Sequence, residues 1–506
     1  MSLARDLKLS DSPFEHYAAE TEPKISLYAI RPPYLETIST RALKLNSFIL
    51  FGDRGAGKSA TRITIYNDMW SADKFAGNED RPFTVNITDF SQILETLQNK
   101  KLKDIDIAGL VAFFVIEQAL VWLSSLEPAE REVFMEALDK DEKTLSLALI
   151  QGFYLNVPEM SRDVSTGNAL KLLNSAWTTK SAVWINKRWT SLSHIVATAV
   201  AGLSKKYVNE DVDIAPAAEK ILASLKGEDA NVSRAVLSKL VEFVQMFGFS
   251  GICLLVDKVD ETPITANSAE ESAKLIHPVL NHIQLLEVEG CSWIFFLWSN
   301  LQKHFNEKLP VRLDKIAHTT IKWEIARLRE MIETRVKFFS DGRLGVADLF
   351  EEGHDVEATF TQLVSLSIKS PRELIKILDT IVREHDAADK GGLLDQESVL
   401  GGADKYVVET IETWYPRKHL QQVLRLGMVS FNNSDVLGKF KISGQGARAK
   451  IKFWEDLGLV AQDGTMPSTK GNKPVNKYIV ADTRVIRIID RKLHDIVGAD
   501  FDGETI

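Results

Sequence analysis

The sequence has few of the residues that build disulfide-bonded or metal-bound scaffolds. It contains two cysteines among 506 residues, Cys253 and Cys291, and both fall inside apolar runs. This number excludes a disulfide framework and a cysteine-based metal site. The histidines, including His304, His318 and His354, show no metal-ligand spacing, so a nuclease, deaminase or protease activity has no support in the sequence. We expect a reduced, cytoplasmic protein.

Long hydrophobic segments are also missing. The first residues, MSLARDLKLSDSPFEHYA, contain no continuous apolar segment, so we expect no secretory signal. The most apolar stretch, residues 107–123, is interrupted by Glu117 and Gln118 and is short for a membrane span. We therefore expect a buried helix there and no membrane partner.

The overall charge is not positive. The net charge of −9 argues against nonspecific binding of nucleic acid by the whole surface, but it leaves room for a local basic face. The apolar fraction of 45% and the charged fraction of 26% are those of an ordinary soluble protein. A chain of 506 residues is too long for one hydrophobic core and suggests about three domains.

The chain contains a series of short apolar runs separated by helical patterns. Runs of this kind are typical of strands in a parallel sheet that is buried on both faces, and they predict a three-layer α/β core with the sheet in the middle. The predicted strands are residues 47–52, 83–90, 251–261, 291–300 and, more weakly, 318–323.

The segments outside these strands indicate the domain organisation. The long helical stretch at about 91–250 predicts a large insertion within a core domain of residues 1–330. Helical patterns then continue through a predicted lid, residues 331–390. Gly391, Gly392, Gly401 and Gly402 predict a linker. The last domain is expected over residues 403–506.

The loop after the first predicted strand has the spacing of a phosphate-binding motif. The sequence GDRGAGKS matches G-x-x-x-x-G-K-[ST]. In such a loop backbone N–H groups turn toward phosphate oxygens, Lys58 reaches the β- and γ-phosphates, and Ser59 binds magnesium. The predicted nucleotide-binding residues are Gly52, Asp53, Arg54, Gly55, Ala56, Gly57, Lys58, Ser59 and Ala60.

Acidic residues follow the third predicted strand, in the sequence LLVDKVDE. The strand delivers Asp257 to its carboxyl end, where this residue could hold the magnesium ion beside Ser59. Asp260 or Glu261 could then polarise the attacking water. Taken alone, these acids would be read as a solvated turn after a core strand, but the phosphate loop upstream favours the functional interpretation.

The ordered motifs GDRGAGKS, LLVDKVDE, FFLWSN and SPREL resemble those of AAA+ and STAND-like P-loop ATPases, particularly origin-recognition-like initiators with a C-terminal winged helix. The resemblance implies ATP hydrolysis with ATP and Mg²⁺ as cofactors. It also implies that Asn300 senses the γ-phosphate and that Arg372 in the lid folds over the phosphates. Arg312 would reach the nucleotide of a neighbouring subunit, so the resemblance implies a homo-oligomer.

The sequence departs from the AAA+ pattern at one position. Lys258 follows Asp257 where many AAA+ proteins have a glutamate, and the acids return at Asp260 and Glu261. The spacing is closer to the D-x-x-D-E arrangement of STAND proteins. It leaves the catalytic carboxylate open and is compatible with hydrolysis slow enough for the protein to act as a switch.

The C-terminal pattern of helix, turn, helix and two strands resembles a winged helix. Residues 436–480 carry eight basic and three acidic side chains, a charge reversal that favours binding of double-stranded DNA. Ser443, Gln445 and Arg448 would lie at the start of the recognition helix. Phe453 and Trp454 are expected in the core.

The sequence thus predicts an ATP-binding and ATP-hydrolysing protein that couples its nucleotide state to DNA through a winged helix. Two alternatives stay open. The first is a DNA-binding regulator or initiator in which ATP is only a conformational ligand and turnover is negligible. The second is a nucleotide-switched signalling or antiviral-defence ATPase, in which the insertion and the winged helix bind proteins and not DNA.

Overall fold

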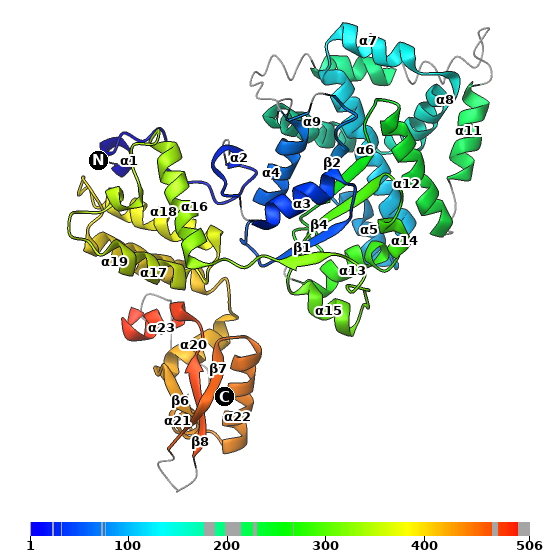
Figure 1. The fold of residues 1–506 in the computed structure, drawn as a ribbon. Helices are drawn as coiled ribbons and strands as arrows, with labels where there is room; N and C mark the ends of the chain where they lie inside the picture. Colours follow the sequence, from blue (N-terminus) through cyan, green and yellow to red (C-terminus); the bar gives the residue numbers. More distant parts are fainter. Residues whose placement is uncertain are drawn as a thin grey trace. The chain divides into compact units, whose positions relative to one another are not determined.

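The computed structural model describes residues 2–22, 25–31, 33–71, 74–75, 77–176, 188–197, 214–225, 230–266, 268–467 and 474–493 (Figure 1). The chain forms two compact units. The first, here named the sheet unit, is Glu22–Lys322; the second, the helical unit, combines Met1–Thr21 with Trp323–Ile506. The division into domains of residues 1–330, 331–390 and 403–506 stays a prediction.

A five-stranded parallel sheet organises the sheet unit, with the strand order β2-β3-β4-β1-β5. Every residue of β1, β2 and β3 is buried. Because successive side chains of a strand point to opposite faces, both faces of the sheet are covered. The predicted α/β core is therefore confirmed. The strands are β1 (Phe48–Gly52), β2 (Phe83–Ile87), β3 (Ile252–Val256), β4 (Cys291–Trp298) and β5 (His318–Thr320).

Helices of the sheet unit pack on this sheet. The helix that follows the phosphate loop, α4, contacts β1, β2 and β4, and α12 contacts β3 and β4. Trp70 at the end of α4 donates its indole N–H to the carbonyl of Thr84 in β2 at 3.1 Å. The helices near the sheet are α2 (Ile25–Tyr28), α3 (Pro33–Leu43), α4 (Lys58–Trp70), α12 (Ala230–Gln245), α13 (Ala269–Leu280), α14 (Ile283–Leu286) and α15 (Leu301–Glu307).

In the described residues, the segment between β2 and β3 consists of helices joined by turns and loops (Figure 1). The helix α6 is long and apolar enough to cross a membrane. Its most apolar 18-residue stretch is nevertheless 94% buried inside the protein, and the helix contacts β2 and α12. Residues 177–187, 198–213 and 226–229 of the predicted insertion lie outside the described residues. The other elements are α5 (Ser91–Asn99), α6 (Asp104–Ser125), α7 (Pro128–Ala137), α8 (Lys140–Leu149), η1 (Ile150–Tyr154), α9 (Glu159–Ala176) and α11 (Ile214–Ser224).

The helical unit begins with the N-terminal segment of the chain. The Leu3 amide donates to the carboxylate of Asp386 at 2.8 Å, and Arg335 donates to the carbonyl of Pro13 at 2.8 Å. The linker predicted at Gly401 and Gly402 is wrong, because both glycines lie inside α19. These helices are α1 (Leu3–Asp6), α16 (Ile325–Phe339), η2 (Val346–Leu349), α17 (Val356–Leu366), α18 (Pro371–Ala387) and α19 (Gln396–Ile411).

The C-terminal part of this unit contains a three-stranded antiparallel sheet with the order β6-β8-β7. Trp454 of α22 is fully buried, contacts the rings of Phe431 and Phe440, and donates to the side chain of Gln422 at 3.2 Å. The elements are α20 (Arg417–Leu426), β6 (Ser430–Asn432), α21 (Asn433–Phe440), α22 (Gly444–Asp456), β7 (Val460–Met466), β8 (Val475–Val480) and α23 (Thr483–Asp490).

Candidate phosphate-binding site

The predicted phosphate loop joins β1 to α4 at the carboxyl edge of the sheet. Gly55 has φ of 77° and Gly57 has φ of 90°, a left-handed conformation that side chains with a Cβ disfavour. Gly57 is the residue before α4, so the loop ends at the N-terminus of a 13-residue helix. Such a terminus presents unpaired N–H groups and a partial positive charge, which suit a phosphate.

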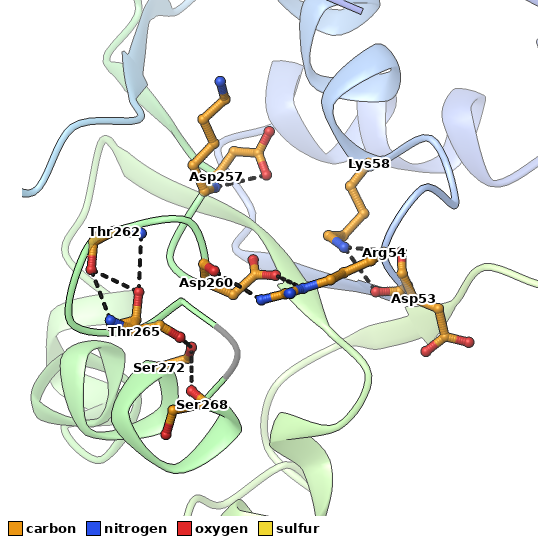
Figure 2. A network of polar contacts seen from close by, with 11 residues as sticks. Asp53, Arg54, Lys58, Asp257, Asp260, Thr262, Thr265, Ser268 and Ser272 are labelled. Atoms are coloured by element: carbon orange, nitrogen blue, oxygen red, sulfur yellow. Dashed lines mark hydrogen bonds and ion pairs between the residues drawn. The ribbon is translucent and has the colours of Figure 1, made fainter. Parts of the chain in front are cut away.

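Lys58 lies against the inside of this loop. Its Nζ donates to the carbonyls of Gly52 at 2.9 Å and Asp53 at 3.1 Å, and the residue is 9% exposed (Figure 2). The Asp53 carboxylate points away from these contacts (Figure 2). The ammonium group of Lys58 is therefore held against the backbone of the phosphate loop.

Ser59 and Asp257 meet across the sheet edge. The Ser59 hydroxyl donates to Oδ2 of Asp257 at 2.8 Å, and Asp257 itself is 2% exposed. They meet because β1 and β3 are parallel, so that the carboxyl ends of both strands lie at the same edge. Hydroxyl and carboxylate oxygens are the hard donors that Mg²⁺ prefers, so this pair fits the predicted metal site.

A residue that the motifs did not indicate, Arg62, contacts Asp257 and connects it to Asn86. Arg62, on α4, donates through Nε to Oδ2 of Asp257 at 3.0 Å and through a terminal nitrogen to Oδ1 of Asn86 at 2.7 Å. Asn86 lies in β2, beside β3. Arg62 is three residues after Ser59, and residues at this spacing share a helix face. This spacing is the one feature of the sequence from which the position of Arg62 beside Ser59 could have been predicted.

Asp260 is bound by the phosphate loop itself. Arg54 donates through Nε to Oδ2 of Asp260 at 3.2 Å and through a terminal nitrogen to its backbone carbonyl at 3.1 Å (Figure 2). The same guanidinium lies over the ring of Trp298, 4.6 Å from its centroid. The Asp260 side chain is 7% exposed and that of Arg54 is 36% exposed.

The loop that carries Asp260 is fixed by a hydroxyl network. The hydroxyls of Thr262 and Thr265 lie 2.7 Å apart, and each accepts a hydrogen bond from the backbone N–H of the other residue. Ser272 of α13 donates to the carbonyl of Ser268 at 2.8 Å (Figure 2). Both threonines are buried, so this loop has a defined conformation next to the phosphate loop.

Other predicted site residues of the sheet unit lie apart from these contacts. The Glu261 carboxylate is half exposed and lies 3.7 Å from Nζ of Lys258. Asn300 is exposed at the start of α15 and makes no capping hydrogen bond with its side chain. Its neighbour Ser299 is closer to the loop, since the Ser299 N–H donates to the carbonyl of Gly52 at 3.3 Å.

The two predicted arginines stay predictions. Arg312 is exposed and forms a bidentate pair with Asp314, with both contacts at 2.8 Å. This pairing raises the pKa of Arg312. Arg372 belongs to the helical unit, in the first turn of α18.

The start of α22 has the predicted polar residues. The Ser443 hydroxyl accepts from the N–H of Gly446 at 3.1 Å and caps the helix, while Gln445 and Arg448 are exposed. Lys450 lies over the ring of Phe440, and burial lowers its pKa. Lys470 and Lys473 of the predicted basic face lie outside the described residues.

One residue of α22 does not lie where the sequence suggested. Phe453, expected in the core, is 60% exposed and stacks on His419 with ring centroids 5.8 Å apart. The helix buries its other face through Trp454, so the adjacent Phe453 points elsewhere.

Comparisons with known proteins give limited similarities. No family model and no curated protein matches the sequence. The chain is similar to the structure of the Aeropyrum pernix ORC1 protein in complex with DNA, with 11% identity, a TM-score of 0.38 and coverage of 96% of this chain and 98% of that one. It is similar to the Aeropyrum pernix ORC2 protein in its ADP form, with 13% identity, a TM-score of 0.38 and coverage of 96% and 99%. For the ADPNP-ADP complexes of that ORC2 protein, the identity is 13%, the TM-score 0.41 and the coverage 96% and 99%.

Proposed function

We propose that the sheet unit binds ATP and hydrolyses it slowly. The observation that carries this proposal is the contact of Ser59 with Asp257, because it joins the two motifs, 198 residues apart in the chain, at the carboxyl edge of one parallel sheet. Phosphoryl transfer depends on positioning and on stabilisation of charge. A glycine-containing loop, a lysine and a buried carboxylate at a helix N-terminus supply those elements.

Each residue of the site has its own proposed role. Loop N–H groups and Lys58 hold the phosphates, while Ser59 and Asp257 would hold Mg²⁺, which when bound neutralises charge on the β- and γ-oxygens. Asp260 or Glu261 remains the candidate to orient water. Asn300, Arg312 and Arg372 are proposed as in the resembling family, with Arg312 acting between subunits.

Steady-state hydrolysis of ATP by the purified chain tests this proposal. We expect slow turnover in the wild type and loss of both nucleotide binding and turnover in Lys58→Ala. Lys239→Ala is the matched control, because Lys239 is an exposed lysine paired only with Glu242 of its own helix in the described residues. Equal ATP affinity in the Lys58→Ala variant and the wild type would refute the proposal.

We also propose that α22 binds double-stranded DNA as the recognition helix of a winged helix. The exposed Arg448 and Gln445 and the basic excess of residues 436–480 support this. The test is DNA binding at several salt concentrations. We expect the salt dependence to weaken when Arg448 and Lys450 are both changed to glutamate. Absence of salt-dependent binding in the wild type would favour the alternative, a switch ATPase that binds a partner protein.

A further inference from the structure

Arg54 spans three neighbouring strand ends of the sheet. It belongs to the loop after β1, it lies over Trp298 at the end of β4, and it binds Asp260 in the loop after β3. The strand order places β4 between β1 and β3, so a side chain that runs from the loop after β1 to the loop after β3 crosses the carboxyl edge of β4. Figure 2 shows Arg54 extending to Asp260. This edge is where ligands bind in open α/β sheets.

The contacts of Arg54 fix its position. The planar guanidinium donates to the carboxylate and to the backbone carbonyl of Asp260 and lies over the ring of Trp298. The buried carboxylate and the Trp298 ring restrict a long side chain that would otherwise lose considerable rotamer freedom on binding a ligand. The side chain is still 36% exposed, so a ligand can reach it from solvent.

The chemistry of this guanidinium suits a terminal phosphate. Arginine binds phosphate oxygens through parallel charge-assisted hydrogen bonds. The loop N–H groups, and Lys58 through its contact with the β-phosphate, would hold both a diphosphate and a triphosphate. Arg54 instead extends from the phosphate loop to the loop after β3 that carries Asp260 and Glu261, the acids of the third-strand motif.

We propose that Arg54 makes the site prefer a nucleoside triphosphate to a diphosphate, and that Asp260 is the positioning residue that holds Arg54. This inference rests on the proposed function of the same site. It assigns to Asp260 a role through Arg54 in place of direct contact with water, and it leaves Glu261 as the remaining acid of the motif that could orient water.

Titration calorimetry with ADP and with the non-hydrolysable analogue adenylyl imidodiphosphate tests the proposal. For Arg54→Gln we expect affinity for the analogue to fall about tenfold or more, the size of a lost charged hydrogen bond, while ADP affinity changes by less than about threefold. Arg54→Lys keeps the charge and should restore part of the preference. Lys239→Gln, the surface control, should leave both affinities unchanged.

A double-mutant cycle tests the role of Asp260. Asp260→Asn should reduce the preference for the triphosphate analogue when Arg54 is present and should not change it in the Arg54→Gln background. An equal effect in both backgrounds, or a loss of ADP and analogue affinity together in Arg54→Gln, would overturn the inference.

The same titrations separate this inference from the proposed function. If the wild type binds neither nucleotide, or if Lys58→Ala binds both as the wild type does, the proposed function fails and the role of Arg54 fails with it. If Lys58→Ala loses both nucleotides and Arg54→Gln keeps the wild-type preference, the site binds nucleotide and only the inference is wrong.

Discussion

Arg62 and Asp257 form an ion pair with both side chains almost fully buried. Nε of Arg62 lies 3.0 Å from Oδ2 of Asp257, and the side chains are 3% and 2% exposed. The carboxylate predicted to hold Mg²⁺ therefore has a compensating charge supplied by α4. Because the pair is neutral as a unit, we expect binding of the metal to depend strongly on the phosphates of the nucleotide.

Removal of Arg62 should destabilise the sheet unit. Arg62→Met leaves the Asp257 charge buried without its guanidinium partner and removes the hydrogen bond to Asn86. Breaking a buried ion pair on one side costs about 3–5 kcal/mol. Urea denaturation of the variant should show this loss, whereas Lys239→Met, which removes an exposed pair with Glu242, should cost at most about 1 kcal/mol. Equal effects would contradict the structural role of Arg62.

Substitution of Gly55 should lower the affinity for nucleotide more than it lowers the stability of the fold. At φ of 77°, alanine is strained by about 1–2 kcal/mol, and relief of that strain reshapes the loop. We expect Gly55→Ala to lower ATP affinity measured by calorimetry. Gly458→Ala is the control, because Gly458 has a similar φ of 74° but lies in the helical unit with open space around its Cβ position. Unchanged ATP affinity in Gly55→Ala would contradict the proposal that nucleotide binding needs the left-handed conformation of Gly55.

Alanine substitutions at two adjacent glycines of α19 should change the stability of the helical unit in opposite directions. A Cβ on Gly402 would lie 2.5 Å from Cα of Ile381 in α18, whereas a Cβ on Gly401 meets nothing within 4 Å. Gly402→Ala should therefore destabilise the helical unit by about 1–3 kcal/mol through overpacking. Gly401→Ala should stabilise it by about 1 kcal/mol through helix propensity. Thermal unfolding of the two variants measures the contrast, and shifts of the same sign would disprove the close approach of α18 and α19.

These glycines show where sequence reasoning reached its limit. A glycine pair indicates either a turn or a close helix contact, and the choice depends on α18, which the local pattern does not include. The contact of Ser59 with Asp257 could be predicted, because the fixed spacing of the loop and the strand ends bring the two side chains to one edge of the sheet. Asn86 and Trp298 could not, since their roles depend on which strands are neighbours in the sheet. Phe453 was wrongly expected in the core, because α22 buries the face that carries Trp454 and Phe453 lies on its exposed side.

Glu117 is a buried carboxyl group in α6 whose titration should affect stability. Ser165 and Thr166 of α9 donate to its two oxygens at 2.8 and 2.9 Å, and the residue is 1% exposed. Burial raises its pKa from 4.5 to about 7, the two hydrogen bonds lower it, and the charge of Asp89 raises it slightly further. The folded protein therefore keeps this proton over a pH range in which the unfolded chain has lost it.

The pH dependence follows from that difference. Below pH 4.5 both states are protonated, and the raised pKa has no effect on the free energy of unfolding. As the pH rises from 4.5 to about 7 the unfolded state binds fewer protons, so stability falls, and above about 7 the full cost of about 3 kcal/mol is present.

Glu117→Gln tests this dependence, because the amide oxygen can still accept hydrogen bonds but the side chain cannot ionise. Urea denaturation at about pH 5 and about pH 8 should give a small difference between wild type and variant at the lower pH. At the higher pH the variant should be more stable by up to about 3 kcal/mol. If wild type and variant lose stability in parallel between the two pH values, the titrating group lies elsewhere and Glu117 is already ionised in the folded protein.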